Sequence, residues 1–518
     1  MDKVTVRFRN WFFGQGTKVA ASELSCTSRN VPGSVWILLG ITIVAGLLRL
    51  LDLGRESLWF DESLSVAVAH LDWKSLWNLL SRFEGNMALY YGLLHLWINF
   101  GESEFVVRSL STLAGLMAVP SIYALGRRLF GAKAGLIGAM LLATNTFHIK
   151  YSQEARGYAL VVLLVILSSF FFVRAIEDQS VSNWVGYVLT SVCAVYSHFF
   201  AVLVIGAQLI SLAVFLPRNV PWKRLLVSLS MIGSLLLPVA MFVMRNGNSS
   251  RLGWIPPPTL YGVYSLFFYS FAGGGRLLFL AYSVLCTVAA LLAVRAWLHH
   301  RASFETWHYA LLLTWLVFPM AATLAVSLRS PVFLDKYLII CLPPLVLLAS
   351  VGLSQIRHRG LLAGCLLVLL ILSARRVFFT HKVIEKEDWR GATSYVVSHG
   401  SPQDGVLFYL YGGRFSFDYY VRRLLPASQG WKVTFPEPWD WEKGWIQAEL
   451  DDSLIGLLPE RYEHVWLFLS HNDLSQTRQQ RADSIQRSLA NEYSNVEVTD
   501  FRGVKVFRYS RREPAQAH

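Results

Sequence analysis

Long apolar segments dominate the first three quarters of the chain. A helix that crosses the hydrocarbon core of a membrane needs about 20 predominantly apolar residues. Eleven segments approach that length, at 34–51, 105–126, 132–149, 157–175, 183–198, 199–216, 225–244, 278–298, 307–327, 337–355 and 360–378. The pattern therefore predicts a polytopic α-helical membrane protein with about eleven spans.

The pattern changes near residue 383, where long apolar runs give way to short alternating ones. It predicts strands at 406–411, 464–470, 496–501 and 504–510, and helices at 388–399, 412–424 and 475–490. The Arg502-Gly503 pair between the last two strands predicts a tight hairpin. We expect three parts, a tail at 1–33, a transmembrane domain at 34–382 and a soluble α/β domain at 383–518.

The connection at residues 52–104 is neither a span nor a polar linker. Its segments 63–82 and 88–100 combine apolar and polar faces. Six aromatic residues lie along the connection, namely Trp59, Trp73, Trp77, Tyr90, Tyr91 and Trp97. Amphipathic helices with such residues are typical of the membrane interface. We therefore expect helices that lie on the membrane surface in this first outer loop.

The distribution of charge gives an orientation. Alternate connections are short and basic, and they contain Arg127, Arg128, Lys133, Arg218, Lys223, Arg224, Arg295, Arg301, Arg357 and Arg359. The N-terminal tail is basic too, so the positive-inside rule places this side in the cytoplasm. Acidic residues gather in the opposite connections. An odd number of spans then places the C-terminal domain outside, in the periplasm or the extracellular space.

Composition agrees with a membrane protein and excludes some functions. Of the 518 residues, 54% are hydrophobic and 16% are charged, and the formal net charge is +13. We assign much of the positive charge to loops beside the spans, where basic residues contact anionic lipid headgroups, so we expect no nucleic-acid partner. The five cysteines form no CxxC pair, which disfavours a disulfide framework or metal knuckle. No GxxxxGKS or GxxxxGKT phosphate loop is present, which disfavours ATP-driven transport.

Two strings place acids at the outer ends of spans. LWFDESLS (58–65) contains Asp61 and Glu62, and YSQEARGY (151–158) contains Glu154 and Arg156. A carboxylate at such a place costs free energy unless it is solvated, paired or bound to a cation. The acids either serve as a general base and cation ligands, or face water as loop residues. Arg156 either binds a phosphate or pairs with Glu154 to fix the loop.

Two further strings contain weaker candidates on the same side. His198 lies between two spans in YSHFFA, and it either packs as a hydrogen-bonded residue or contacts a ligand. Lys336 and Tyr337 open the tenth span. Lys336 either extends along the helix to the interface or balances the charge of a phosphate.

Taken in order, these strings resemble lipid-linked glycosyltransferases of the GT-C fold, in the family 39 branch with aminoarabinose transferases and protein mannosyltransferases. LYYGLLHLW (89–97), SEFVVRSLS (103–111), DKYL (335–338) and KEDWRGA (386–392) extend the resemblance. Two positions depart from it. Many relatives have His-Pro-Pro where this chain has Gly85-Asn86-Met87-Ala88, and they commonly have Arg where this chain has Lys336.

The resemblance implies a membrane glycosyltransferase whose catalytic domain is residues 34–382. It implies transfer of a hexose or pentose from a polyprenyl-phosphate donor to a glycan, lipid or protein acceptor at the periplasmic face of a bacterial inner membrane. It assigns catalysis to Asp61, Glu62 and Glu154, and substrate binding to Arg156, His198, Lys336 and Tyr337. We expect Asp61 to be the base, with Glu62 orienting the loop or sharing a cation, although the sequence does not decide which of these two acids takes the proton. Mg²⁺ or Mn²⁺ is left open, with the three acids as candidate ligands. Neither the sugar nor the acceptor follows.

The main alternative is a transporter or flippase for a lipid-linked saccharide. Transporters place charged groups near the middle of the membrane on broken helices, often in inverted repeats. Here the acids lie at span ends and no repeat is visible, which favours the enzyme. A non-catalytic assembly subunit is a third interpretation, and it would tolerate replacement of the acids.

Overall fold

The computed structural model describes residues 33–215, 220–246, 255–299, 303–382, 386–426, 430–437, 450, 452–471 and 476–511. The predicted N-terminal tail lies outside these residues except for Gly33. The chain forms two compact units. Unit 1 contains residues 1–51, 111–153 and 157–381, and unit 2 contains residues 52–110, 154–156 and 382–518. The connection at residues 52–104 and the C-terminal segment therefore belong to the same compact unit.

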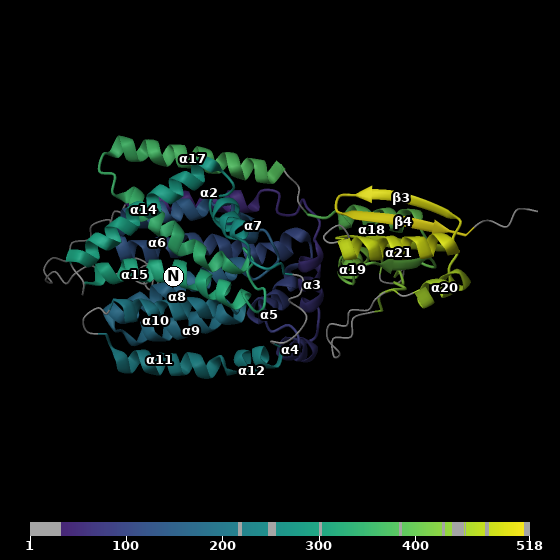
Figure 1. Ribbon diagram of the computed structural model, residues 1–518, viewed down its shortest axis with the longest axis horizontal. Helices are drawn as coiled ribbons and strands as arrows, with labels where there is room; N and C mark the ends of the chain where they lie inside the picture. Colours follow the sequence, from purple (N-terminus) through teal and green to yellow (C-terminus); the bar gives the residue numbers. More distant parts are fainter. Residues whose placement is uncertain are drawn as a thin grey trace, which may run out of the picture. The chain divides into compact units, whose positions relative to one another are not determined.

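Unit 1 is a helical bundle, and Figure 1 shows α6, α8, α10, α11 and α15 running side by side. Its elements are α2 (Gly33–Leu50), most of α6 (Glu104–Ala143), α7 (Thr146–Ser152), α8 (Tyr158–Asp178), α9 (Val181–Ser197), α10 (Ala201–Val214), α11 (Trp222–Leu235), α12 (Leu237–Asn246), α13 (Leu260–Ser265), η3 (Leu266–Phe271), α14 (Arg276–His299), α15 (Phe304–Ser327), η4 (Tyr337–Cys341), α16 (Leu342–Ser354) and α17 (Arg359–Lys382).

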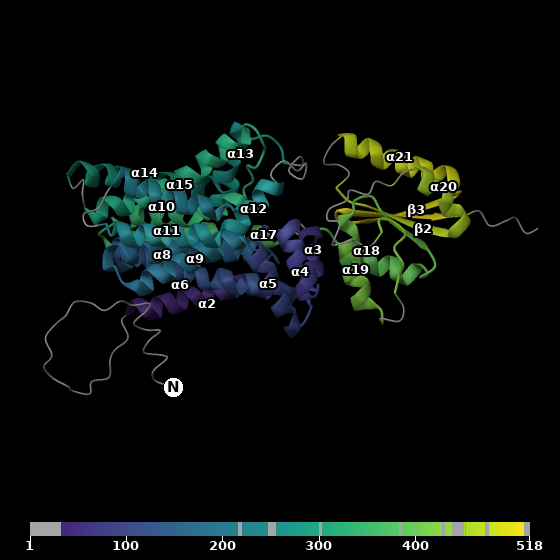
Figure 2. The same cartoon turned by 90° about the horizontal axis from the view of Figure 1, so that it is seen from below.

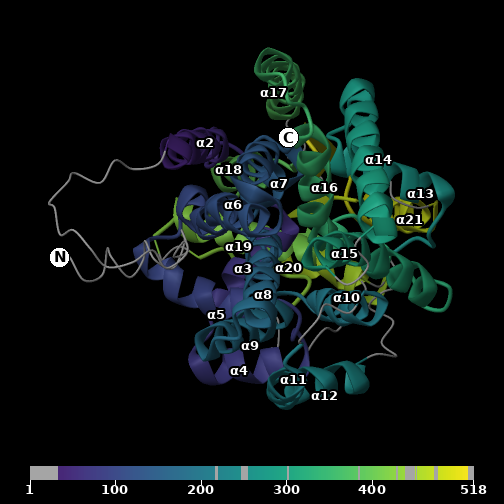
Figure 3. The ribbon, with the colours of Figure 1, turned by 90° about the vertical axis from the view of Figure 1, so that its left-hand side faces the viewer.

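The bundle has interior and peripheral helices. Seen along the bundle in Figure 3, α8 and α16 lie inside and α2, α14 and α17 lie at the rim. The most apolar windows of α8 and of η4 with α16 are 72% and 89% buried, whereas those of α14 and α17 are 17% buried. An apolar helix with so much exposed surface is suited to contact with lipid. The structure therefore confirms a polytopic helical protein that crosses the membrane several times.

The number of spans differs from the simple count of apolar segments. Among the described residues, seven helices are long and apolar enough to cross a membrane, or eight if the bent pair α11 and α12 is one span. The predicted spans at 105–126 and 132–149 both begin within α6, where Gly131 interrupts the helix. The helices α9 and α10 have 17 and 14 residues, which is shorter than a typical span.

Unit 2 begins with the helices of the connection at residues 52–104. They are α3 (Phe60–Ala69), α4 (Trp73–Arg82), α5 (Ala88–Trp97) and the short η1 (Ile98–Phe100). The single segment predicted at 63–82 is in fact two helices. Asp72 separates them because its side chain accepts hydrogen bonds from the N–H groups of Lys74 and Ser75 and so caps the start of α4.

The C-terminal part of unit 2 is an α/β layer structure. It contains α18 (Trp389–His399), β1 (Gly405–Phe408), α19 (Gly412–Leu424), α20 (Asp452–Arg461), β2 (His464–Leu469), α21 (Gln476–Glu492), β3 (Asn495–Phe501) and β4 (Val504–Ser510). Within the described residues the sheet has the order β1-β2-β4-β3, with β1 parallel to β2 and the other pairs antiparallel. Figure 2 shows α20 and α21 on one face and α18 and α19 on the other.

The predicted strands and helices of this segment are confirmed, and α20 is an addition to them. Phe501 pairs with Val504, and Gly503 has a φ of 71°, as the predicted hairpin requires. On the side of α18, the Trp389 ring stacks on Phe468 with 6.0 Å between ring centroids. The sheet therefore fixes α18, and with it the start of the C-terminal segment.

Gly131 offers a test of the break in α6. Its backbone angles (φ 89°, ψ 170°) lie in a region that only glycine adopts readily, while an added Cβ would meet no atom within 4 Å. We expect Gly131→Ala to lower the free energy of unfolding by about 1–3 kcal/mol through backbone strain alone.

The matched control is Gly364→Ala, because Gly364 lies within α17 and also has open space around a Cβ. A helical Gly→Ala change is neutral or stabilising by up to about 1 kcal/mol. Thermal unfolding in detergent compares the two variants, and equal midpoints would contradict the break at Gly131.

Candidate active site

The Glu62 carboxylate is fully buried and accepts four hydrogen bonds. Arg108 donates from Nε (2.8 Å) and Nη2 (2.7 Å), Lys386 donates from Nζ (3.1 Å), and Ala155 donates its backbone N–H (3.0 Å). Burial by itself raises the pKa of the Glu62 carboxyl, but the charges of Arg108 and Lys386 and these hydrogen bonds hold it at about 2. Glu62 is therefore an anion at neutral pH.

Arg108 uses all five of its N–H donors. Besides the two bonds to Glu62, its Nη1 donates to the carbonyls of Leu53 (2.9 Å) and Glu56 (2.8 Å), and its Nη2 donates to that of Ser57 (2.9 Å). These carbonyls belong to the chain that enters α3. One buried guanidinium therefore fixes both the acid in the first turn of α3 and the backbone before it.

Asp61 precedes Glu62 but has a different environment. Adjacent residues on a helix project about 100° apart, so the two carboxylates of α3 point in different directions. The Asp61 residue is half-buried, whereas Glu62 is fully buried. The backbone carbonyl of Asp61 accepts hydrogen bonds from Ser65 Oγ (2.9 Å) and Arg156 Nη1 (3.4 Å). Asp61 is thus the more accessible acid of the pair.

Residues 154–156 form a tight turn against α3 and α5. The Arg156 N–H donates to the Glu154 carbonyl at 2.7 Å, and both side chains are largely buried. Arg156 Nη1 also donates to the Tyr91 hydroxyl at 3.1 Å. With the bond from Ala155 to Glu62, these contacts bring the two predicted acidic strings together within unit 2.

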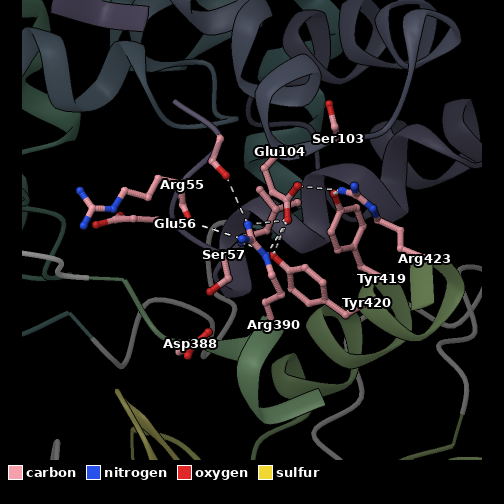
Figure 4. Close-up of polar contacts among 12 residues, drawn as sticks. Arg55, Glu56, Ser57, Ser103, Glu104, Asp388, Arg390, Tyr419, Tyr420 and Arg423 are labelled. Atoms are coloured by element: carbon pink, nitrogen blue, oxygen red, sulfur yellow. Dashed lines mark hydrogen bonds and ion pairs between the residues drawn. The ribbon is translucent and has the colours of Figure 1, made fainter. Parts of the chain in front are cut away.

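Glu104, at the start of α6, is the centre of a second ionic group in unit 2. It accepts hydrogen bonds from Arg390 Nη2 (2.8 Å) in α18, and from Arg423 Nη1 (2.8 Å) and the Tyr420 hydroxyl (3.2 Å) in α19. Figure 4 shows these side chains converging on the Glu104 carboxylate. The C-terminal segment is therefore tied to the start of the helix that carries Arg108.

The remaining predicted residues form a group of their own in unit 1. The His198 ring lies 5.0 Å from that of Tyr337 and 5.9 Å from that of Tyr158, measured between centroids. Lys336 Nζ lies 5.9 Å from the centroid of the Tyr158 ring, within the range of a cation–π contact. The structure thus gathers His198, Lys336 and Tyr337 around Tyr158.

The three candidate metal ligands do not form a ready cation site. Within the described ranges, no group of three or more His, Cys, Asp or Glu side chains is arranged to hold a metal ion. Glu62 in particular directs its oxygens at Arg108, Lys386 and Ala155. A divalent cation at these acids therefore stays a prediction.

Sequence reasoning did not identify Arg108 and Lys386 as partners of Glu62. A usable signal existed for Arg108, since an arginine in an otherwise apolar stretch requires a buried anion or carbonyl groups. Lys386 lies 324 positions from Glu62 along the chain, and no local pattern links them. Both residues belong to strings that carry the resemblance, SEFVVRSLS and KEDWRGA.

Comparison with known proteins gives one family match. Residues 92–244 match the family described as dolichyl-phosphate-mannose-protein mannosyltransferase. This stretch includes Arg108, Glu154, Arg156 and His198, but it precedes Lys336 and follows Asp61. No curated protein is significantly similar to the chain in sequence.

Several solved structures are similar to the whole chain. ArnT from Cupriavidus metallidurans, in the apo state, has a TM-score of 0.63 and 14% identity, with 92% of this chain and 98% of that chain covered. The same protein bound to undecaprenyl phosphate has a TM-score of 0.58 and 12% identity over 92% and 98% of the two chains. The oligosaccharyltransferase of Archaeoglobus fulgidus, tethered to an acceptor peptide, has a TM-score of 0.51 and 12% identity over 93% and 75%.

At these identities the likeness concerns the fold, and it extends over both the bundle and the C-terminal segment. The chain therefore has the GT-C fold of membrane glycosyltransferases, and over residues 92–244 it matches their mannosyltransferase family.

Proposed function

We propose that this protein transfers a sugar from a polyprenyl-phosphate donor to an acceptor at the outer face of a bacterial inner membrane. The family match, the fold and the paired acids of α3 support this proposal. The similar ArnT binds undecaprenyl phosphate, which is a lipid carrier of this class. The observation that carries the proposal is the division between the two neighbouring acids.

This division assigns a different role to each acid. Glu62 is saturated by two cations and an amide, and its pKa of about 2 makes it a poor proton acceptor at neutral pH. Its role is to hold α3, the turn at residues 154–156 and Lys386 in one arrangement. Asp61 is half-buried whereas Glu62 is fully buried, so the Asp61 carboxylate is the more accessible of the two and is suited to meet an acceptor hydroxyl.

The reaction is a displacement at the anomeric carbon. Asp61 takes the proton of the acceptor hydroxyl as the oxygen forms a bond to that carbon. The bond between the anomeric carbon and the phosphate oxygen breaks, and the electron pair leaves with the polyprenyl phosphate. Arg156 balances the charge of the departing phosphate, and Glu154 is the second acid beside the reacting groups.

The unit 1 group around Tyr158 is proposed as a separate contact for the lipid-linked donor. Lys336 provides a positive charge for an anionic group. His198 and Tyr337 provide aromatic surface, because their rings pack together at 5.0 Å. The sugar, the acceptor and any divalent cation stay open within this proposal.

Replacement of the proposed base gives the direct test. We expect Asp61→Asn to lower the rate of transfer of labelled sugar from polyprenyl-phosphate donors by roughly 1,000-fold, because a general base contributes about 10²–10⁴-fold. Glu154→Gln is expected to lower it as well. The assay uses purified full-length protein whose folding is checked by thermal unfolding.

Asp72→Asn is the matched control, because Asp72 lies in the same outer connection and asparagine caps a helix as well as aspartate does. It should transfer sugar at the wild-type rate. Full transfer by a folded Asp61→Asn variant would refute the assignment of the base. Movement of the lipid across the bilayer without any transfer would favour a flippase.

Glu62 is expected to govern stability more than proton transfer. At pH 7, Glu62→Gln leaves the buried Arg108 and the partly buried Lys386 without their anion, and we expect a loss of about 3–5 kcal/mol in the free energy of unfolding. Chemical denaturation in detergent measures this loss.

The same carboxylate predicts a pH dependence. Its pKa is about 2 in the folded protein against an ordinary value of 4.5, so its stabilising contribution is complete above about pH 4.5 and is lost as the pH falls toward 2. Wild type should therefore lose about 3 kcal/mol more than Glu62→Gln over this range. Parallel stability curves for the two proteins between pH 5 and pH 2 would contradict the ion pair.

A further inference from the structure

One face of α19 is directed at the start of α3. Gly412, Ser416 and Tyr420 are spaced four residues apart, so they form a single stripe along α19. Each of the three contacts a different residue next to the acidic pair. All of these residues belong to unit 2, although more than 300 positions separate the two helices in sequence.

At Gly412, the first position of the stripe, there is no room for a side chain. A Cβ on Gly412 would lie 2.1 Å from Cδ2 of the Phe60 ring, which is far closer than any real contact. The Phe60 ring therefore packs directly on the backbone of α19. Phe60 is the residue immediately before Asp61, so this contact fixes the position at which α3 begins.

The other two positions form buried hydrogen bonds. Ser416 Oγ donates to Ser63 Oγ at 3.0 Å, and both residues are buried. The Tyr420 hydroxyl accepts the N–H of Leu58 at 2.7 Å and donates to Glu104 at 3.2 Å. The contacts at Leu58, Phe60 and Ser63 thus lie on both sides of the acidic pair.

The start of α3 needs such support because its own sequence provides little. Trp59, the N-cap residue, makes no side-chain capping hydrogen bond, whereas the neighbouring α4 is capped by Asp72. A helix without a capping side chain leaves its first N–H groups to other partners. The hydroxyl of Tyr420 reaches the chain at this point, one residue before the N-cap.

The adjacent positions of α19 hold the helix against the start of α6. The Tyr419 hydroxyl donates to the carbonyl of Glu102 at 2.6 Å, and Arg423 pairs with Glu104 at 2.8 Å. Burial raises the pKa of the Tyr419 and Tyr420 hydroxyls, and the charge of Glu104 raises it further, so both remain protonated donors at neutral pH. α19 is therefore anchored independently of its contacts with α3.

We propose that α19 is a fixed template for the first turn of α3, in which Gly412, Ser416 and Tyr420 are positioning residues for Asp61. The inference rests on the proposed function for what Asp61 does, and on the contacts alone for where α19 lies. The three residues touch the backbone and side chains beside Asp61. A misplacement of about 1 Å in a catalytic group can cost about 100-fold in rate.

Removal of one hydroxyl tests the positioning role. Tyr420→Phe keeps the ring and loses the bonds to Leu58 and Glu104, so we expect kcat for sugar transfer to fall about 10-fold while KM for the donor stays unchanged. Tyr493→Phe is the control, because the Tyr493 hydroxyl is also bound to a carbonyl, that of Tyr462, within the C-terminal segment. It should leave kcat unchanged.

A change in thermal stability with unaltered kcat in Tyr420→Phe would reduce the role to one of folding and overturn the proposal. A rise in KM with constant kcat would overturn it too, since it would indicate a binding role. Gly412→Ala should lower kcat in the same way, because the added methyl displaces Phe60.

A cross-link tests the contact without any activity. Ser63→Cys combined with Ser416→Cys places two thiols where the hydroxyls lie 3.0 Å apart, and mild oxidation of the purified protein should join them. Among the described residues the natural cysteines are Cys193, Cys286, Cys341 and Cys365, and all four belong to unit 1. Mass mapping of the non-reduced protein identifies the bond, and Ser63→Cys with Ser398→Cys, on an exposed part of α18, is the control that should not join.

The locked protein should transfer sugar at the same rate before and after reduction, because a fixed template does not move during turnover. Failure of the cross-link would overturn the packing of α19 on α3. Loss of transfer on oxidation, restored by reduction, would overturn the fixed template. The two proposals can fail separately. If the cysteine variant forms the cross-link but the wild-type protein transfers no sugar, the proposed function is contradicted and the contact between α19 and α3 is established.

Discussion

The ion pair between Glu62 and Arg108 is the interaction on which the rest of unit 2 depends. Two opposite charges that are both removed from water are stable only when every donor and acceptor is satisfied. Here Arg108 uses its five N–H groups on Glu62 and on three carbonyls before α3, and Glu62 also accepts from Lys386 and Ala155. Loss of any partner would leave a charge that is buried in the protein without a compensating group, which costs free energy. The arrangement of four separate chain segments is therefore fixed by a single electrostatic requirement.

This requirement gives the two neighbouring acids different properties. Glu62 is committed to its partners, and its low pKa reflects how strongly they favour the charged form. Asp61, one residue earlier, lies on another side of α3 and remains half-buried. The turn that contains Glu154 and Arg156 is brought beside Asp61 because Ala155, at its centre, donates to Glu62. The structural acid thus positions the groups for which a chemical role is proposed.

The C-terminal segment extends the same principle. Glu104 binds Arg390, Arg423 and Tyr420, and α19 then contacts the chain on both sides of Asp61 and Glu62. The α/β layers themselves pack through other residues, such as Trp389 and Phe468. The stripe of Gly412, Ser416 and Tyr420 is suited to a close approach between helices. Within unit 2, the C-terminal segment is therefore packed against the residues on both sides of the acidic pair.

The sequence by itself determined the elements whose cause is local. Apolar length indicated a bundle of membrane-crossing helices, although it gave eleven spans where seven or eight of the described helices are long and apolar enough. Alternation indicated the four strands and Gly503 the hairpin, because each depends on residues that are close together in sequence. It also identified three acids, Asp61, Glu62 and Glu154, and the cation Arg156 at places where a charge costs free energy. Only the tertiary structure decided that Glu62 is bound by Arg108 and Lys386, that Glu104 joins α6 to α18 and α19, and that Asp61 is the more accessible acid. These partners lie tens to hundreds of positions apart, and burial, not sequence spacing, selects them.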